Sequence, residues 1–369
     1  MSKRYAILIS TLFCLFLFGF GVAHLLTPDR DFSQQENRYL ASFPRPTLAT
    51  LKDGSFMEDF EDYIIDQFPF RDGWIALKAG VERLLGKQEN NGVYLGTDGQ
   101  TLFAQYTPPD DLAVRVGYVN ELASHLEIPV WFALIPDKSY VWADRLPAHA
   151  PLVDDGSVLT GAAALVSPSV HWIDLSGALS GEDAFYRTDH HWTTQGAAQV
   201  HQALGAAMYG GATLPDTPLT QVADDFYGTT WSSSGARWVA PDVIHTWVPE
   251  QGLSVTSHRT GEGVSAPLYD RSFLEKKDKY SLFLGGNQSL CVIENPEGTR
   301  GKLLVIRDSY ADSLAPFLAL DHQEVHLWDL RHNRSSLAQY VAQQEIDRVL
   351  VLYSNANFAT DSNLFFMTR

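Results

Sequence analysis

The last third of the chain alternates between strand-like and helix-like segments, and this alternation restricts the possible folds more than any other feature. Short apolar runs are separated by segments whose apolar residues recur at helical spacing, which predicts strands and helices in turn over 303–306, 311–320, 324–330, 337–344 and 348–353. Such alternation is typical of βαβ units, in which the strands form a parallel sheet. We therefore predict an α/β fold with helices flanking a parallel sheet. Its ligands should bind beyond the carboxyl ends of the strands.

The same pattern begins earlier in the chain. Helices are predicted over 110–126 and 194–209, and apolar, β-branched runs predict strands over 129–135 and 170–175. The segment 210–278 breaks the pattern, because it is rich in turn residues and carries several aromatic side chains. We expect this segment to be an irregular insertion of short strands and loops that packs over a site.

The N-terminus carries an apolar segment of the length that a membrane span requires. Lys3 and Arg4 precede an apolar run from Tyr5 to Leu26, and about 20 such residues cross a hydrocarbon core. Basic residues at the start favour an N-terminus inside the cell and a body outside it. Two alternatives fit: an uncleaved single-pass anchor in the cell membrane, or a signal peptide cleaved near Gly21-Val22-Ala23. The length of the run favours the anchor, whereas cleavage would give a secreted or periplasmic protein.

These segments divide the chain into three regions. We expect residues 1–26 to be the membrane anchor or signal and residues 27–50, which are polar and interrupted by prolines, to be a linker. Residues 51–369 should then form one α/β domain that contains the insertion at about 210–278. A region of that length is large enough to bury a substantial core.

Charge and cysteine content exclude several kinds of partner. The 44 acidic side chains outnumber the 27 basic ones and give a formal charge of −17, which repels phosphate backbones, so nucleic acid is not an expected partner. Cys14 lies in the N-terminal apolar run, and if that run is in lipid or is cleaved off, Cys14 cannot pair with Cys291 in the mature fold. The chain then has no disulfide framework or thiolate metal site. The chain also lacks a glycine-rich phosphate loop. We therefore expect no cofactor.

Two short segments, more than a hundred residues apart, together carry the residue types of a Ser-His-Asp catalytic triad. Ser309 follows the predicted strand 303–306 and precedes a helix, and Asp189 stands two residues before His191. In such a triad the serine is the nucleophile and the imidazole takes its proton. The carboxylate orients the imidazole and stabilises its cation. A strand-to-helix turn also leaves backbone N–H groups free to stabilise an oxyanion.

Structural roles are open for the same residues. Ser309 is also placed to cap the following helix, which is a common role for serine. Asp189, His190 and His191 are metal-ligand types as well, or they form a polar loop with one packed histidine. A metal site needs three or four ligands, and no second cluster has a matching spacing. We therefore expect no metal here, and we expect Trp192 to be a packing residue.

Further polar residues are candidates for a role beside the serine, and two of them fall at the same edge of the predicted sheet. Arg331 and Asn355 follow predicted strands, and Asn287 follows two glycines that either let the backbone approach a ligand or make a turn. An asparagine beside the serine is a possible oxyanion donor, although asparagines are equally common in turns. With Tyr310 and His190, these three are the candidates for oxyanion stabilisation or substrate contact.

The combination of motifs resembles the DHHW family of exported proteins, which is named for the tetrad seen here at 189–192. The likeness extends over most of the chain from about residue 30. Its landmarks are Glu36-Asn37-Arg38, Asp66-Gln67-Phe68-Pro69-Phe70-Arg71, Pro136-Asp137-Lys138 and Arg307-Asp308-Ser309-Tyr310.

That family is similar to the AlgX/AlgJ-type proteins of alginate O-acetylation. The resemblance implies an SGNH-hydrolase-like, flavodoxin-like domain that is circularly permuted, because the Asp/His block precedes the serine block. It also implies that Asp189, His191 and Ser309 are catalytic. The asparagine of the SGNH pattern would fall within Tyr353–Asn357, where the full Gly-x-Asn-Asp pattern is missing.

The reaction implied by this resemblance is O-acetylation of a cell-surface or secreted polysaccharide, with a membrane-bound acyltransferase as a partner that supplies acetyl groups. A carbohydrate O-acetylesterase is one alternative. A non-catalytic polysaccharide-binding or assembly protein that uses the aromatic residues of the insertion is the other.

Overall fold

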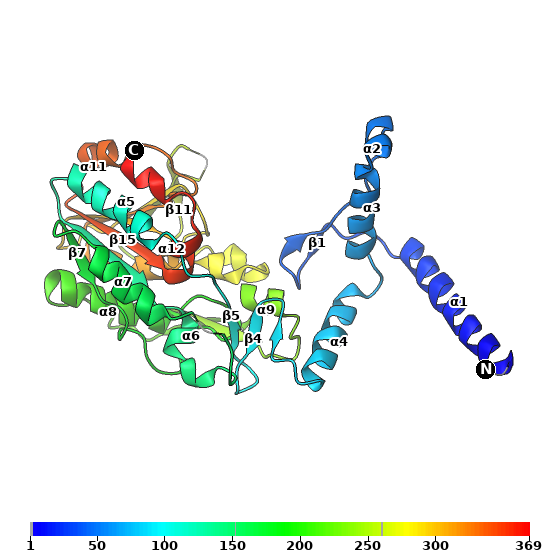
Figure 1. Ribbon diagram of the computed structural model, residues 1–369. Helices are drawn as coiled ribbons and strands as arrows, with labels where there is room; N and C mark the ends of the chain where they lie inside the picture. The colour runs from blue at the N-terminus through cyan, green and yellow to red at the C-terminus, as the bar shows by residue number, and fades with distance from the viewer. Residues whose placement is uncertain (1–2, 152, 260) are drawn as a thin grey trace. The chain divides into compact units, whose positions relative to one another are not determined.

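The computed structural model describes residues 3–151, 153–259 and 261–369 (Figure 1). These residues form two compact units. The first comprises the described residues up to Asn90 together with Gly235–Arg237, and the second comprises Asn91–Ser234 and Trp238–Arg369. Each unit is considered by itself.

The first unit is mainly helical. Its elements are α1 (Lys3–Leu26), β1 (Phe32–Ser33), β2 (Arg38–Tyr39), α2 (Leu48–Asp53), α3 (Ser55–Asp66), α4 (Arg71–Leu84) and β3 (Glu89–Asn90). Helix α1 coincides with the predicted apolar run and buries none of its residues. Within the described residues it is the one helix that is long and apolar enough to cross a membrane.

Two of the landmark segments meet in this first unit through ion pairs. The Arg38 guanidinium donates to both carboxylate oxygens of Asp66, at 2.8 and 2.5 Å, and Arg71 pairs with Glu36. The hydrogen bond from Arg38 holds the pKa of Asp66 below its ordinary value, although burial opposes this shift. Gln67 adds hydrogen bonds to backbone groups of the segment that precedes α2. These landmarks therefore stabilise the first unit and carry no visible chemistry.

The second unit is built on an eight-stranded sheet with the order β11-β10-β12-β14-β13-β15-β6-β7. The strands are β6 (Val130–Ile135), β7 (Val170–Ile173), β10 (Ser254–Ser257), β11 (Val264–Ala266), β12 (Leu290–Glu294), β13 (Lys302–Arg307), β14 (Glu324–Trp328) and β15 (Arg348–Ser354). The five from β14 to β7 are parallel, and β12, β10 and β11 continue the sheet in antiparallel pairs.

Strand β13 is the centre of this topology. The two strands that follow it in the chain lie on opposite sides of it, β14 on one side and β15 on the other. Counted from β13, the parallel strands have the flavodoxin-like order 2-1-3-4-5, whose switch point falls between β13 and β15. The fourth and fifth strands, β6 and β7, come first in the chain. The predicted flavodoxin-like fold and its circular permutation are therefore confirmed.

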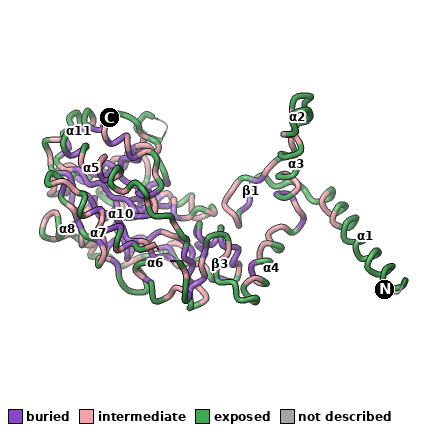
Figure 2. The backbone as a smooth tube through the Cα atoms, viewed as in Figure 1, coloured by how far each residue is buried: buried purple, intermediate pink, exposed green. Residues whose placement is uncertain are grey.

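Helices cover both faces of the sheet. They are α5 (Leu112–His125), α7 (Asp155–Leu165), α8 (Thr194–Tyr209), α10 (Ala311–Asp321), α11 (Leu337–Gln344) and α12 (Asn355–Thr360). Along β13, Leu303 and Val305 pack in one core with α8 and α10, and Leu304 and Ile306 pack in the other with α5, α7 and α11. This alternation explains why residues 303–306 of β13 are all apolar, as expected for a strand that is buried on both faces. Figure 2 shows the sheet as buried and the helices as partly exposed.

The segment 210–278 contains more regular structure than an irregular insertion. Its first half forms an antiparallel pair, β8 (Thr220–Phe226) and β9 (Asp242–Thr246), with α9 (Thr229–Ser234) between them. Its second half contributes β10 and β11 to the main sheet, where Val255 pairs with Ile293 of β12. These edge strands are short and carry few apolar residues, so their sequence gives little periodic signal.

One buried histidine makes the stability of this unit sensitive to acid. The His322 side chain donates from Nδ1 to the Leu318 carbonyl at 2.8 Å and accepts from the Tyr209 hydroxyl at 2.8 Å. Burial lowers the pKa of His322 to about 4.

The unfolded histidine, with a pKa of about 6.5, binds more protons than the folded one between about pH 6.5 and 4. We therefore expect the free energy of unfolding to fall by up to about 3 kcal/mol over that range as the pH decreases. Denaturant unfolding of the wild type and of His322→Gln at about pH 7 and about pH 4.5 measures this term. An equal pH dependence in both proteins would assign the acid sensitivity to other groups.

Candidate active site

Ser309 lies in the turn between β13 and α10, at the carboxyl edge of the sheet and at the switch point. The preceding carboxylate fixes this turn. Asp308 accepts hydrogen bonds from the Tyr310 backbone N–H at 3.0 Å, from the Ser354 N–H and hydroxyl at 2.8 and 2.7 Å, and from the Asn357 amide at 2.8 Å. Because Ser354 ends β15, these bonds tie the serine turn to the neighbouring strand. Asp308 is therefore a positioning residue.

His191 joins the serine to a carboxylate. Its Nε2 lies 2.8 Å from the Ser309 hydroxyl oxygen, and its Nδ1 lies 2.6 Å from Oδ1 of Asp189. A carboxylate only accepts, so Nδ1 carries the proton and Nε2 of the neutral ring accepts from the serine hydroxyl. The structure thus brings together the three residues that the sequence pattern selected, in the geometry of a Ser-His-Asp triad.

Both carboxylate oxygens of Asp189 accept hydrogen bonds. Its Oδ2 accepts from the backbone N–H and the hydroxyl of Thr229, at 2.7 and 3.0 Å, and its Oδ1 accepts from the His191 N–H. Burial would raise the pKa of Asp189, but the neighbouring imidazoles and the hydrogen bonds from His191 hold it well below its ordinary value. A Cβ at position 228 would lie 2.3 Å from this carboxylate, so only glycine fits there. Asp189 is therefore ionised when the site is folded.

Lys138, from the landmark Pro136-Asp137-Lys138, anchors the loop that carries the triad acid and base. Its buried ammonium donates to the backbone carbonyls of Tyr186 at 3.0 Å and Asp189 at 2.7 Å. Burial lowers its pKa to about 8, and neighbouring carboxylates, first Asp242, oppose the shift. Sequence reasoning placed this lysine in a landmark without a role, because its partners are backbone atoms that no side-chain pattern reveals.

Tyr280 packs against the imidazole of His191 and helps to hold it in place. Its ring stacks on that of His191, with centroids 3.9 Å apart and planes 12° from parallel. Its hydroxyl donates to the Ser309 carbonyl at 3.1 Å and lies 3.0 Å from the hydroxyl of Ser313, which also accepts from the Trp192 indole at 2.8 Å. Trp192 is fully buried, so its predicted packing role is confirmed. Sequence reasoning missed Tyr280, since nothing in its local sequence distinguishes it.

Two substitutions separate the stacking by Tyr280 from its hydrogen bonding. Tyr280→Phe keeps the ring on His191, so we expect kcat for ester hydrolysis to fall less than about tenfold. Tyr280→Ala frees the imidazole to rotate away from Ser309, and we expect a loss of about 100-fold in kcat, because a general base must be held in position. Steady-state kinetics with an aryl acetate measures both. Equal losses in the two variants would assign the effect to the hydroxyl and contradict a stacking role.

The remaining candidates fall into two groups. Tyr310 and His190 lie beside the triad: the Tyr310 hydroxyl donates to the His190 carbonyl at 2.5 Å, and His190 Nδ1 lies 2.9 Å from the Thr229 hydroxyl. Both line a cavity of about 210 Å³, which is also lined by Thr229 and Ser354. Arg331 and Asn287 instead bond to each other at 3.2 Å, and Arg331 forms a double hydrogen bond with Asp329. No bond in the described part of the chain joins this second group to the triad.

An oxyanion needs N–H donors close to the serine. The backbone N–H of Ser309 donates no hydrogen bond within the described residues, so it is free to face a ligand. Asn355 begins α12 and is buried, and neither the nitrogen nor the oxygen of its side-chain amide has a hydrogen-bond partner within the described structure. In the described structure no hydrogen bond joins that amide to Ser309. The Ser309 N–H is therefore the better-placed donor in this geometry.

Asp189, His190 and His191 also form a group of metal-ligand types. One ligand atom from each lies within 4.8 Å of the others. However, the two carboxylate oxygens of Asp189 and Nδ1 of His191 already bond to one another and to Thr229. A metal ion would have to break these bonds, which the triad geometry uses.

Comparisons with known proteins agree with this fold. A family model described as an SGNH hydrolase-like domain of the acetyltransferase AlgX matches residues 109–235. A "Probable alginate O-acetylase AlgJ" of Pseudomonas syringae pv. tomato is 27% identical over 197 residues, which are 49% of this chain and 50% of the relative. The chain spans about half the length of the curated relatives that it matches.

Two solved structures are similar over most of the chain. A DHHW family protein from Eubacterium siraeum has a TM-score of 0.63 at 20% identity, over 76% of this chain and 95% of that one. Bacillus cereus PatB1 has a TM-score of 0.62 at 21% identity, over 74% of this chain and 99% of that one. The fold is thus that of an SGNH-hydrolase-like α/β protein. Together with the family model and the AlgJ relatives, these likenesses confirm the resemblance to DHHW and AlgX/AlgJ-type proteins.

Proposed function

We propose that this protein is a serine-dependent acyltransferase that acetylates hydroxyl groups of a polysaccharide. The observation that carries the proposal is the pair of contacts made by His191, 2.8 Å to the Ser309 hydroxyl and 2.6 Å to Asp189. A serine that only capped a helix would not need an imidazole oriented by a buried carboxylate. The alternative of a non-catalytic binding protein leaves this arrangement without a use.

In the first half-reaction, Ser309 Oγ attacks the carbonyl carbon of an acetyl ester and its proton passes to Nε2 of His191. The carbonyl oxygen becomes an oxyanion that the Ser309 N–H is placed to stabilise. The tetrahedral intermediate then collapses, the bond to the leaving oxygen breaks, and His191 returns the proton to that oxygen. An acetyl-serine remains. Asp189 stabilises the imidazolium throughout and itself remains unprotonated.

In the second half-reaction, a sugar hydroxyl gives its proton to His191 and attacks the acetyl carbon. Ser309 leaves and takes the proton back from His191, so an acetylated sugar and free enzyme are formed. Water in place of the sugar would make the protein an esterase. Both reactions use the same residues, so what separates them is which acceptor reaches the acetyl-serine.

The substrate class and the location rest on the relatives and on α1. The matched relatives are described as alginate O-acetylases and the family model as an acetyltransferase, which supports a polysaccharide acceptor. Helix α1 is exposed and apolar over its length, as an anchor or a signal would be. We propose that residues 1–26 anchor the protein, that 27–50 are a linker, and that 51–369 act outside the cytoplasm. A membrane-bound acyltransferase would supply the acetyl groups.

Parallel assays of transfer and hydrolysis test this proposal. The full chain is incubated with an aryl acetate, with and without an alginate-derived oligosaccharide, and both released phenol and acetylated sugar are measured. The proposal predicts acetylated sugar with the wild type and none with Ser309→Ala. Release of acetate alone under all conditions would identify an esterase. Equal activity in the two proteins would reject the serine mechanism.

A further inference from the structure

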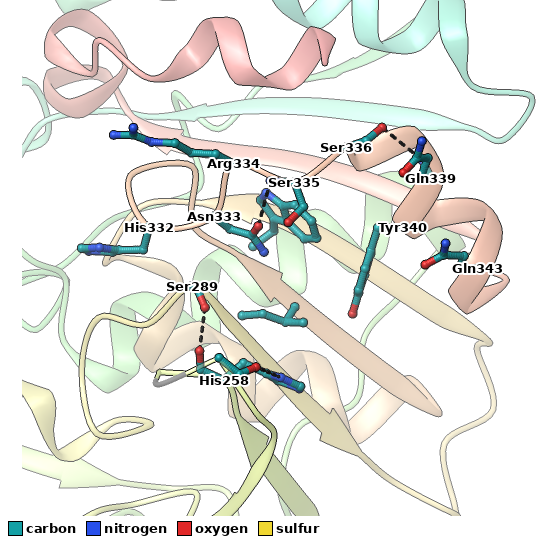
Figure 3. A pocket seen from close by; sticks show the side chains of 13 residues that line it. His258, Ser289, His332, Asn333, Arg334, Ser335, Ser336, Gln339, Tyr340 and Gln343 are labelled. Carbon is teal, nitrogen blue, oxygen red and sulfur yellow. Dashed lines mark hydrogen bonds between the residues drawn. The ribbon is translucent and has the colours of Figure 1, made fainter.

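A second cavity opens in the α/β unit, away from the triad residues. It has a volume of about 570 Å³ and lies beside the end of β14, the start of β12 and the end of β10 (Figure 3). We propose that this cavity is a sugar-binding subsite, which holds one hydroxyl-rich unit of the acceptor polysaccharide while a distant unit of the same chain is at Ser309. The proposal rests on the proposed function for its acceptor, but its binding site stands on separate observations.

The position of the cavity suits a polymer that also reaches the triad. Trp328 ends β14, Leu290 begins β12 opposite it, and His258 follows β10, and all three line the cavity. Ser309 follows β13 at this same edge of the sheet, one strand beyond β14. Neighbouring strands are about 4.8 Å apart, so Ser309 and the far wall of the cavity are separated by roughly 14 Å. A short oligosaccharide covers that distance.

One residue that lines the cavity has a buried hydrogen-bond donor without a partner. The indole of Trp328 is 1% exposed, and its Nε1–H makes no hydrogen bond within the described structure. The ring is held in place, since it packs edge-on against Tyr340 with centroids 4.8 Å apart, and the Tyr340 hydroxyl is bonded to His326 at 2.7 Å. A buried N–H group normally has a hydrogen-bond acceptor. The missing acceptor of this N–H points to an oxygen atom supplied by a ligand or by water. A rigid aromatic pair beside such a donor is suited to the apolar face and hydroxyl rim of a sugar.

Helix α11, which carries Tyr340, also supplies polar side chains that line the cavity. Gln339 and Gln343 lie one turn apart on α11 and line the cavity, and their side-chain amides form no hydrogen bond within the described residues. In Figure 3, Tyr340 and Gln343 project from α11 toward the side where Ser289 and His258 lie. Each amide offers both donors and acceptors, which matches hydroxyl groups that donate and accept in turn. Two such amides can therefore bind a sugar through hydrogen bonds to its hydroxyl groups.

The charge of the lining favours a polyol over a phosphate. Among the described lining residues Arg334 is the one arginine, and none is lysine, aspartate or glutamate. The Arg334 guanidinium lies over the ring of Phe366, 5.1 Å from its centroid, and Figure 3 shows it pointing away from Tyr340 and Gln343. Phosphate sites normally present several cationic or clustered backbone donors to the anion. This cavity presents amides, hydroxyls and an indole instead.

Calorimetric binding and acceptor kinetics on the full chain in detergent test the subsite. The test variant is Gln339→Ala/Gln343→Ala, and the matched control is Gln344→Ala, which removes the same group from the same helix outside the cavity. The probes are short and long oligosaccharides from alginate and from cellulose, with inorganic phosphate as a competitor. We expect the double variant to bind long oligosaccharides about tenfold more weakly than the wild type and the control. Hydrolysis of an aryl acetate should be unchanged.

Each outcome separates this proposal from the proposed function. A raised KM for long acceptors with unchanged kcat supports the subsite, as does weaker binding even if no transfer is detected, in which case the proposed reaction alone fails. Unchanged affinity in the double variant overturns the subsite while leaving the triad chemistry intact. Displacement of the oligosaccharide by phosphate, with the double variant affecting both, would overturn the assignment to a polyol.

Discussion

Replacing Ser309 with alanine is expected to lower kcat/KM for acetyl transfer and for aryl acetate hydrolysis by about four orders of magnitude or more. His191 Nε2 contacts the Ser309 hydroxyl at 2.8 Å, and alanine offers no atom to carry the acetyl group. The turn itself should persist, because it is held by the bonds of Asp308 to Ser354 and Asn357, and alanine keeps those. Initial rates with an aryl acetate give the comparison.

Ser180→Ala is the matched control, since this exposed serine bonds only through its backbone. It should keep wild-type rates, and thermal unfolding of all three proteins should agree within a few degrees. Activity in Ser309→Ala comparable to that of the control would show that the hydroxyl takes no part in the reaction.

Replacing Asp189 with asparagine is the second large effect that we expect, with a loss of about 10³- to 10⁴-fold in kcat. The amide cannot stabilise an imidazolium. If its NH₂ group faces Nδ1, the imidazole must also adopt the tautomer that leaves Nε2 protonated and unable to accept from Ser309. Asp189 Oδ2 also accepts two bonds from Thr229, so the variant should unfold at a lower temperature as well.

The loss of kcat and the loss of stability are separable. Asp224→Asn makes the same change at an exposed position and should alter neither. Rates measured well below the unfolding temperature of Asp189→Asn report the chemistry alone. If Asp189→Asn is less stable but keeps the wild-type kcat, Asp189 has a structural role and no role in the chemistry.

The sequence predicted the strands and the pairing of Asp189 with His191 for the same reason: both depend on short-range patterns. Residues 303–306 of β13 are all apolar because both faces of the strand are buried, and the residues that follow the strand must emerge at the carboxyl edge. The spacing of two between Asp189 and His191 lets one carboxylate oxygen accept from both the ring and the backbone of His191. Such features are visible without knowledge of the fold.

The residues that hold the triad in place were not predictable in this way. Tyr280 reaches His191, and Lys138 reaches the carbonyl of Asp189, only after distant segments have packed. Likewise, the sequence places Arg331 at the same edge as the serine, yet its side chain bonds to Asn287 and Asp329. The carboxyl edge of a sheet is wide enough to hold two separate sites. Which residues belong to which site depends on the order of the strands, and that order is set by tertiary packing.

The most direct test of the account is to locate the acetyl group on the enzyme. The full chain is mixed briefly with an aryl acetate, quenched in acid, and its intact mass and proteolytic peptides are measured. We predict one acetyl group on the wild type, carried by the peptide that contains Ser309, and none on Ser309→Ala. Acetylation of another residue, or equal labelling of both proteins, would contradict a serine-borne acetyl intermediate.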